Sequence, residues 1–194
     1  MKPLRFRITA VAHNRDKEYL LDPREAPYLV PLGLLSGDGR PRADKADKYR
    51  QLQSLIKILD DLVRKSELRS KRTLRVVDMG CGKGYLTFGA WHMLCRRWRI
   101  PARVIGVETR PELVKSINEV ARRIDAPNLE FIAGTIANVE LPRVDALIAL
   151  HACNTATDDA IRRGIELGAK LIVVEPFIIK QLKQQLVIKL IVVE

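Results

Sequence analysis

The sequence predicts an α/β fold in which a parallel sheet carries helices on both faces. After residue 72, short apolar runs rich in β-branched residues alternate with amphipathic helical patterns, and this alternation is typical of βαβ crossovers. A glycine-rich turn follows the first of these runs directly, at the place where nucleotide-binding sheets hold their ligand. The length of 194 residues suits one domain. Together these features indicate a Rossmann-like domain.

The composition is that of a soluble globular protein, with 47% hydrophobic and 29% charged residues. No run approaches the roughly 18 apolar residues of a membrane span, and the segment 1–7 lacks the apolar core of a signal peptide. We therefore expect a cytoplasmic protein with no membrane partner. Three widely spaced cysteines (Cys81, Cys95 and Cys153) form no C-x-x-C pair, so neither a disulfide framework nor a metal site is indicated.

The formal net charge of +11, with a pI near 9.9, is the strongest compositional signal. Such an excess favours a polyanionic partner, most often nucleic acid, because each neutralised phosphate releases counterions. The alternative is a protein family that uses arginine heavily without such a partner.

Residues 1–42 hold five of the ten prolines and the turn-like sequence Ser36-Gly-Asp-Gly39. We interpret them as an irregular N-terminal cap with one short strand at 6–11. Residues 43–194 then form the Rossmann-like domain, and the two parts make a single globular unit.

From residue 43 to about 68, apolar residues recur at three- and four-residue spacing, which predicts an amphipathic helix. Its first turns carry Lys45, Lys48 and Tyr49, which we expect to bind substrate along a groove. A solvated face is the alternative reading of these charges. The chain that follows predicts strands at 74–78, 103–108, 129–133, 144–150 and 170–175, and helices at 84–98, 111–124 and 156–167.

The glycine-rich turn has the pattern D-x-G-x-G-x-G, which begins at Asp78 at the end of the first predicted strand. Glycines at alternate positions (Gly80, Gly82 and Gly84) let the backbone adopt positive φ and let a ligand approach closely. The spacing fits neither a dinucleotide fingerprint, because the sixth position from Gly80 is Tyr85, nor a phosphate loop. A glycine-rich turn in an unrelated α/β protein is the alternative.

This pattern resembles the first motif of class I S-adenosylmethionine-dependent methyltransferases. The resemblance implies S-adenosylmethionine as cofactor and places Asp78, Gly80, Cys81, Gly82 and Gly84 around it. Glu108 ends the second strand, 30 residues after Asp78. In the family an acid here accepts hydrogen bonds from ribose hydroxyls, whereas the alternative is an exposed glutamate at a strand end.

The family usually places an aspartate near the adenine of the cofactor, after the third strand. This chain has Thr135 there, so we expect the backbone of Thr135 and Ile136, or the threonine hydroxyl, to contact the adenine.

The fourth predicted strand runs into the segment His151-Ala-Cys-Asn-Thr-Ala-Thr-Asp158, which in class I enzymes faces the methyl donor. The catalytic candidates are therefore His151, Cys153 and Asp158, with Asn154 at the substrate and His151 also beside the cofactor. Histidine can serve as a general base near neutral pH, although a structural histidine is the alternative. Cys153 could attack a pyrimidine ring, but the Pro-Cys motif of such enzymes is missing, and a packed thiol is the alternative.

The segments 10–15, 45–51, 77–87 and 150–158 narrow the resemblance. They are similar to a family of methyltransferase domains that includes the catalytic part of the glutathione-transferase C-terminal-domain-containing protein and, more distantly, transfer-RNA 2′-O-methyltransferases. Members usually continue with Pro-Cys-Cys after the fifth strand, whereas this chain has Pro176-Phe-Ile-Ile-Lys180.

A class I sheet resembling this one has two further strands, and only 19 residues follow the fifth predicted strand. Residues 170–175 also recur letter for letter as 189–194. We therefore expect a sheet that lacks part of its C-terminal strands, or one that a second copy of the chain completes as a dimer.

These features predict an S-adenosylmethionine-dependent methyltransferase that acts on RNA. Two alternatives stay open: a methyltransferase of a small molecule or protein, and a non-catalytic module that binds S-adenosylmethionine or RNA.

Overall fold

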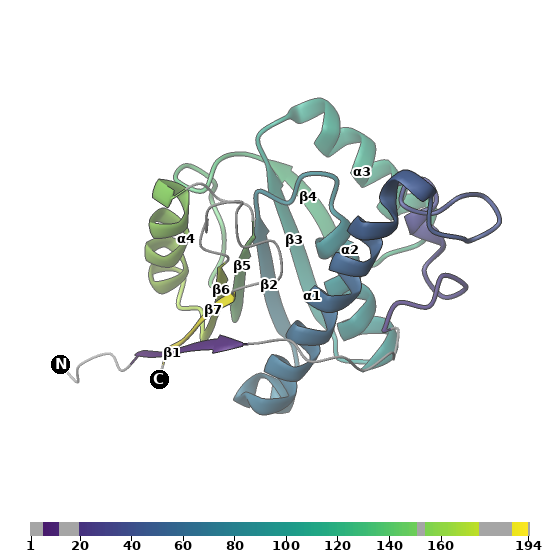
Figure 1. Cartoon of the computed structure of the whole chain (residues 1–194). Helices are drawn as coiled ribbons and strands as arrows, with labels where there is room; N and C mark the ends of the chain where they lie inside the picture. The colour runs from purple at the N-terminus through teal and green to yellow at the C-terminus, as the bar shows by residue number, and fades with distance from the viewer. Residues whose placement is uncertain (1–5, 12–19, 151–153, 175–187, 194) are drawn as a thin grey trace.

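The computed structural model describes residues 6–11, 20–150, 154–174 and 188–193 (Figure 1). These residues form one seven-stranded sheet in the order β1-β7-β6-β5-β2-β3-β4. The strands are β1 (Phe6–Val11), β2 (Leu74–Met79), β3 (Ala102–Glu108), β4 (Leu129–Ala133), β5 (Ala146–Ala149), β6 (Leu171–Val174) and β7 (Ile188–Val193). The α-helices are α1 (Ala46–Lys65), α2 (Tyr85–Trp91), α3 (Pro111–Arg123) and α4 (Asn154–Glu166).

Five strands, β6-β5-β2-β3-β4, pair in parallel and confirm the predicted Rossmann-like sheet. The chain moves outward from β2 through β3 to β4, and then returns to the other side of β2 for β5 and β6. The order of strands reverses between β2 and β5. In open sheets of this kind, ligands bind beyond the carboxyl ends of the strands at such a reversal.

The sheet is larger than the sequence led us to expect, because two antiparallel strands extend it beyond β6. β7 pairs with β6, with Leu171 opposite Val192, and the predicted N-terminal strand β1 pairs with β7, with Phe6 opposite Val193. The second copy of the repeated sequence is thus used as a strand against the first copy. Both antiparallel strands come from the chain itself.

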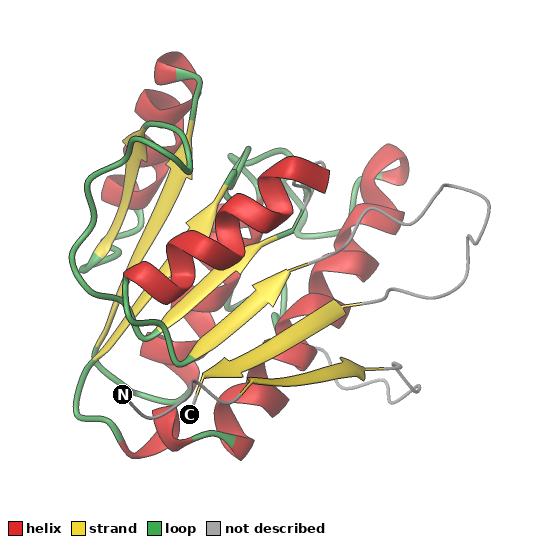
Figure 2. Ribbon diagram, turned by 90° about the vertical axis from the view of Figure 1, so that its left-hand side faces the viewer, coloured by secondary structure: helices red, strands yellow, loops and turns green. Residues whose placement is uncertain are grey.

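Two apolar layers cover the two faces of the sheet. Along β2, Leu74 and Val76 face the layer formed with α1, α2 and α3, whereas Val77 and Met79 face the layer that includes α4. This alternation follows from the two-residue period of a strand. Figure 2 views the molecule from the α4 side, so that α4 lies in front of the strands.

Residues 20–35 belong to the same core as the sheet. Leu21, Tyr28, Leu29 and Leu34 are fully buried, and the ring of Tyr28 stacks on that of Phe88 in α2 with 5.3 Å between centroids. This part of the N-terminal cap therefore covers the outer side of α1 and α2. In the part of the chain that the structure describes, no helix is both long enough and apolar enough to cross a membrane.

Candidate cofactor site

A cavity of about 370 Å³ opens at the carboxyl end of β2, between the glycine-rich turn and α1. The turn and the helix after it supply Asp78, Gly80, Cys81, Gly82, Lys83, Tyr85 and Leu86. Helix α1 and the residue before it supply Lys45, Lys48, Gln51, Leu52 and Leu55, and the segments after β3 and β5 supply Arg110 and Leu150. The cavity therefore lies where the strand order reverses, at the position expected for the ligand.

The turn has the backbone conformation that its glycines permit. Gly80, Gly82 and Gly84 have φ values of 73°, 56° and 73°, in the left-handed region that other residues rarely adopt. The amides of Gly80 and Cys81 both donate to the carbonyl oxygen of Val107 at 2.9 Å. These bonds fix the turn to the end of β3, and no Cβ of the three glycines occupies the space above it.

Glu108 is the best-connected polar side chain at the site, and it is only 6% exposed. Its carboxylate accepts hydrogen bonds from the Gly82 amide at 3.0 Å, from the Thr109 hydroxyl at 3.1 Å, and from both the amide and the guanidinium of Arg110. The Arg110 guanidinium in particular lowers the pKa of this carboxyl to about 2. Glu108 is therefore ionised, and it ties the glycine-rich turn to the end of β3.

Asp78 is buried at the base of the cavity, where the Thr87 hydroxyl donates to it at 2.6 Å. Burial raises the pKa of Asp78 to about 7, even though the Thr87 hydrogen bond acts in the opposite direction. Asp78, which lines the cavity, thus gains charge near neutral pH. Glu108 does not line the cavity itself, but its ionised carboxylate binds the lining residues Gly82 and Arg110.

Cys81 contributes packing and backbone rather than a reactive thiol. Its side chain is half-buried, and burial raises the pKa of the thiol well above its usual value. A Cβ on Gly106 in the neighbouring strand would lie only 2.9 Å from the Cys81 sulfur. The sulfur therefore fills the space that this glycine leaves.

Lys45, just before α1, and Lys48 and Gln51 within it line the cavity. Substrate binding by the two lysines stays a prediction. Lys48 lies over the Tyr85 ring, with 5.7 Å from its amino nitrogen to the centroid. Tyr49, in contrast, does not line this cavity: it is 4% exposed, and its hydroxyl donates to the Leu21 carbonyl at 2.9 Å. Tyr49 faces the N-terminal cap and Lys48 the cavity, because successive residues of a helix point in different directions.

Thr135 and Ile136 do not line the cavity either. The amide and hydroxyl of Thr135 both donate to the Asn138 side chain at 2.8 Å, and this closes a turn after β4. Gly134 donates to the carbonyl oxygen of Glu108 at 3.0 Å, which keeps this turn next to β3. Their contact with an adenine stays a prediction.

The residues after β5 are described only in part. Leu150 lines the cavity, whereas the catalytic candidates His151 and Cys153 lie outside the described residues. Asn154 begins α4, and Asp158 is exposed in the second turn of that helix.

Several residues that line the cavity were not among the predicted site residues, chiefly Gln51, Lys83, Tyr85, Arg110 and Leu150. Position along the helix could have found Gln51, which is three residues after Lys48. Arg110 had a weaker signal, because only its place two residues after Glu108 distinguishes it from the other arginines.

Comparisons with known proteins agree with this geometry. Residues 47–185 match the model of a family described as "Methyltransferase domain". A malonyl-(acyl-carrier protein) O-methyltransferase of Acetivibrio thermocellus is 30% identical over 110 residues, which cover 57% of this chain and 35% of that protein. The chain therefore spans about a third of the length of this curated relative.

Two solved structures share the fold. A candidate RNA methyltransferase from Pyrococcus horikoshii has a TM-score of 0.54 and 14% identity, covering 88% of this chain and 96% of its own. Magnesium protoporphyrin IX methyltransferase from Synechocystis, with S-adenosylhomocysteine bound, has a TM-score of 0.53 and 19% identity, covering 79% and 67%. With the family match over most of its length, the chain belongs to the methyltransferase domain family and has the fold of the class I enzymes, whose cofactor is S-adenosylmethionine.

Proposed function

We propose that this protein transfers a methyl group from S-adenosylmethionine to RNA. The observation that carries the proposal is the basic edge of the cofactor cavity, where Lys45, Lys48 and Lys83 line the space directly above the glycine-rich turn. Lys83 is exposed, and it has no ion pair with the described part of the chain. Such an edge attracts a polyanion to the mouth of the methyl-donor site.

The donor set of the cavity fits the cofactor. We expect the Glu108 carboxylate to accept hydrogen bonds from ribose hydroxyls, and its charge and its bonds from Gly82 and Arg110, which line the cavity, support this role. The glycine-rich turn leaves open space for the amino-acid part, beside the carboxyl of Asp78. The cofactor supplies an activated methyl on a sulfonium. The chain supplies position and exclusion of water, which give much of the rate in such a displacement.

His151 is the proposed general base, because it directly follows Leu150 in the sequence and Leu150 lines the cavity. We expect His151→Ala to leave cofactor affinity nearly unchanged and to lower RNA methylation by about 100-fold, the scale of general-base catalysis. Titration calorimetry and isotope transfer measure the two quantities. Unchanged methylation would assign the base to another residue.

Incubation of bulk cellular RNA with the protein and isotope-labelled S-adenosylmethionine, followed by mass spectrometry of the nucleosides, tests the proposal. A labelled nucleoside is the expected product. The double variant Lys45→Ala/Lys48→Ala should raise KM for RNA several-fold, because it removes two positive charges from the mouth of the site. Both lysines also line the cofactor cavity, so titration calorimetry measures the cofactor affinity separately. Lys170→Ala, which removes an exposed charge at the start of β6, is the matched control.

A small-molecule carboxylate is the second candidate substrate, and the 30% identity to the malonyl-(acyl-carrier protein) O-methyltransferase favours it. The basic edge would then neutralise a single carboxylate. The two candidates differ in the product: a methyl ester loses its label in mild alkali, whereas a methyl on a nucleobase or ribose keeps it. Label in neither product, with the cofactor bound, would indicate a non-catalytic module.

A further inference from the structure

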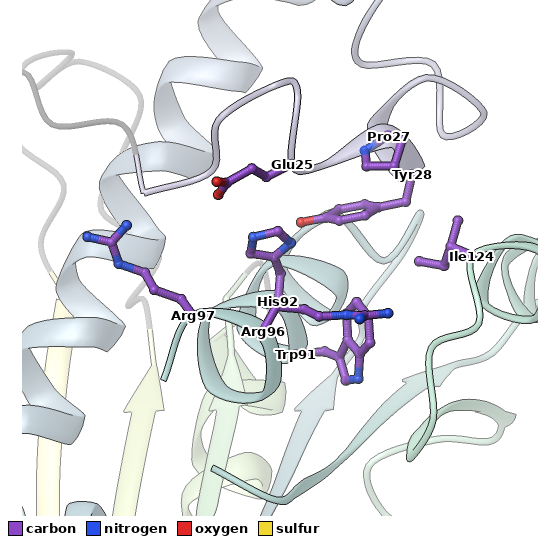
Figure 3. A pocket seen from close by; sticks show the side chains of 8 residues that line it. All are labelled: Glu25, Pro27, Tyr28, Trp91, His92, Arg96, Arg97 and Ile124. Carbon is purple, nitrogen blue, oxygen red and sulfur yellow. The ribbon is translucent and has the colours of Figure 1, made fainter. Parts of the chain in front are cut away.

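Two hollows adjoin one another at the other end of the α2 segment from the cofactor cavity. The first, of about 470 Å³, is lined by Glu25, Tyr28, Trp91, His92 and Arg96 among others (Figure 3). The second, of about 430 Å³, is lined by Arg64, Arg69, Arg97, Trp98 and Ile100. Arg97 lines both hollows, so they are neighbours on the surface of the molecule.

The surface is separate from the methyl-donor site. Tyr85 lines the cofactor cavity, and the helical segment that it begins runs on through a π-helical turn, His92–Arg97, to the hollows. From Tyr85 to Arg97 the segment advances by twelve residues, which corresponds to about 18 Å at the rise of an α-helix. Wide turns of this type occur frequently at functional sites, and this turn supplies His92, Arg96 and Arg97.

Both tryptophans of the chain carry stacked arginines here. Arg96 lies over the Trp91 ring at 5.2 Å from its centroid, as Figure 3 shows, and Arg64 and Arg69 lie over Trp98 at 4.9 and 5.8 Å. Stacking immobilises a guanidinium without using its N–H donors. Arg64 uses its Nε for Asp60, and Arg96 uses one nitrogen for the Asp125 carbonyl, so further donors of each remain for a phosphate.

The Tyr28 side chain, which lines the first hollow, carries a hydroxyl whose hydrogen-bonding capacity is unused in the described structure. The Tyr28 hydroxyl is buried and has no hydrogen-bond partner in the described structure, although buried polar groups nearly always have one. In Figure 3 it points toward His92 and Glu25. A neutral imidazole offers one donor and one acceptor and a carboxylate only acceptors, and burial lowers the pKa of His92.

This combination matches an unpaired nucleotide. The edge of a base carries both donors and acceptors, which Glu25, Tyr28 and His92 complement. Glu25 disfavours a phosphate beside it, which places phosphates on the arginine side. The half-buried Trp98 ring and the stacked guanidiniums continue this path, in the manner of proteins that bind single strands.

We propose that the two hollows form a second RNA-binding site, which holds a single-stranded part of the substrate at the end of the α2 segment away from the cofactor cavity. The inference rests on the proposed function, because it extends the RNA substrate beyond the acceptor nucleotide. It implies that RNA long enough to reach both sites is methylated at lower concentration than a dinucleotide.

The test uses oligouridylate and the double variant Arg69→Ala/Arg96→Ala, which removes one stacked arginine from each tryptophan. Binding is followed by intrinsic tryptophan fluorescence, since both tryptophans line the hollows. Each phosphate contact of a single strand contributes about 0.7 to the slope of log affinity against log salt. The variant makes two such contacts fewer, so its slope should be smaller by about 1.4. Over a fourfold rise in salt, the affinity of the wild type should therefore fall about sevenfold more than that of the variant.

The control Arg143→Ala/Lys170→Ala removes the same charge from exposed residues near α4, on the opposite face of the sheet. It should keep the slope, and both variants should bind S-adenosylmethionine like the wild type. The second site would be refuted by equal slopes for the two double variants or by a wild type that does not bind oligouridylate. It would also be refuted if the wild type bound adenosine monophosphate as tightly as oligouridylate. Arginine-dependent binding without methyl transfer to any RNA would instead leave the site in place and refute the proposed function.

Discussion

At the scale of single residues, Asp78 in the cofactor cavity and Glu108 beside it have pKa values shifted in opposite directions. Burial raises the pKa of Asp78 to about 7, whereas the Arg110 guanidinium and neighbouring donors lower that of Glu108 to about 2. The difference follows from their partners: Asp78 has one hydroxyl, and Glu108 has a guanidinium and two amides. Glu108 therefore stays ionised near neutral pH, whereas a cationic ligand can change the protonation of Asp78.

The affinity for S-adenosylmethionine should rise as the pH increases through 7, because the sulfonium is attracted to ionised Asp78 and not to the neutral acid. Asp78→Asn should make the affinity nearly independent of pH between 6 and 8. Titration calorimetry in two buffers of different ionisation enthalpy checks this, since wild-type binding at pH 6 should release a proton. A pH-dependent affinity that persists in the variant would exclude Asp78 as its source.

The same pKa shift affects stability. Folded protein keeps the Asp78 proton up to about pH 7, whereas the unfolded chain loses it near its ordinary value of 3.8. The free energy of unfolding should therefore fall as the pH rises between these values and then stay constant. Compared with wild type, Asp78→Asn should gain stability over this range, as measured by Tm. Parallel Tm curves for the two proteins would contradict this.

Glu108→Gln should weaken cofactor binding by about 1–3 kcal/mol, because it removes charge from a hydrogen-bonded acceptor and leaves Arg110 without its ion pair. Its pKa is depressed, so its stabilising contribution is complete above pH 4.5 and is lost as the pH falls toward 2. Wild type and variant should thus converge in stability at low pH. Titration calorimetry and acid denaturation test the two parts separately.

At the scale of elements, the packing of β3 against β4 depends on Gly106, because the Phe131 ring occupies the space where a side chain would lie. A Cβ on Gly106 would lie 2.4 Å from Phe131 Cδ1 and 2.9 Å from the Cys81 sulfur. Phe131 is also held by its neighbours: its ring packs on Phe88 at 5.2 Å, and its backbone bonds the Asn118 side chain in both directions. The ring therefore has little freedom to move away from an added methyl group.

Gly106→Ala should destabilise the protein by about 1–3 kcal/mol, the usual cost of overpacking a core. Because Cys81 belongs to the glycine-rich turn, the substitution should also weaken cofactor binding. Gly37→Ala is the matched control, since an added Cβ there meets nothing within 4 Å and the backbone is not left-handed. Urea denaturation measures the difference, and equal midpoints for the two variants would refute this account of the packing.

Much of the element pattern could be predicted because it depends on local sequence. The apolar runs and their spacing predicted all five parallel strands and three of the four α-helices to within a few residues, whereas α2 ends seven residues before the predicted bound of 98. The π-helical turn at His92–Arg97 could not be foreseen, since its sequence reads as an ordinary continuation of α2. Tyr49 was misplaced for a related reason. Its spacing fitted the buried face of α1, and only the tertiary fold shows that the N-terminal cap covers that face.

At the scale of the whole molecule, the site could be predicted where one short stretch of sequence carries it. Asp78, Gly80 and Gly82 line one cavity and Glu108 accepts a hydrogen bond from Gly82, as expected, because parallel strands bring their carboxyl ends to one edge. Arg110 and the part of α1 at the cavity depend on how elements far apart in sequence pack. The strand at 6–11 was predicted, but β7 and its pairing with β1 and β6 were not, because this pairing joins segments far apart in the sequence and no local pattern specifies such a partner.

β1 protects the edge of the sheet. It pairs with β7 along all six of its residues, and β7 in turn pairs with β6. Because β7 repeats the sequence of β6 and pairs with it antiparallel, an uncovered β7 would offer its free edge to the same sequence in a second chain.

Deletion of residues 1–11 should therefore cause self-association while leaving cofactor affinity near that of the wild type, since the described lining of the cofactor cavity comes from residues 45–150. Light scattering and titration calorimetry measure the two effects. Replacement of residues 6–11 by an equally long Gly-Ser segment should behave like the deletion, because glycine and serine pair poorly as a strand. A monomeric deletion variant would show that β1 is dispensable as an edge, and lost cofactor binding would show that it supports the cavity.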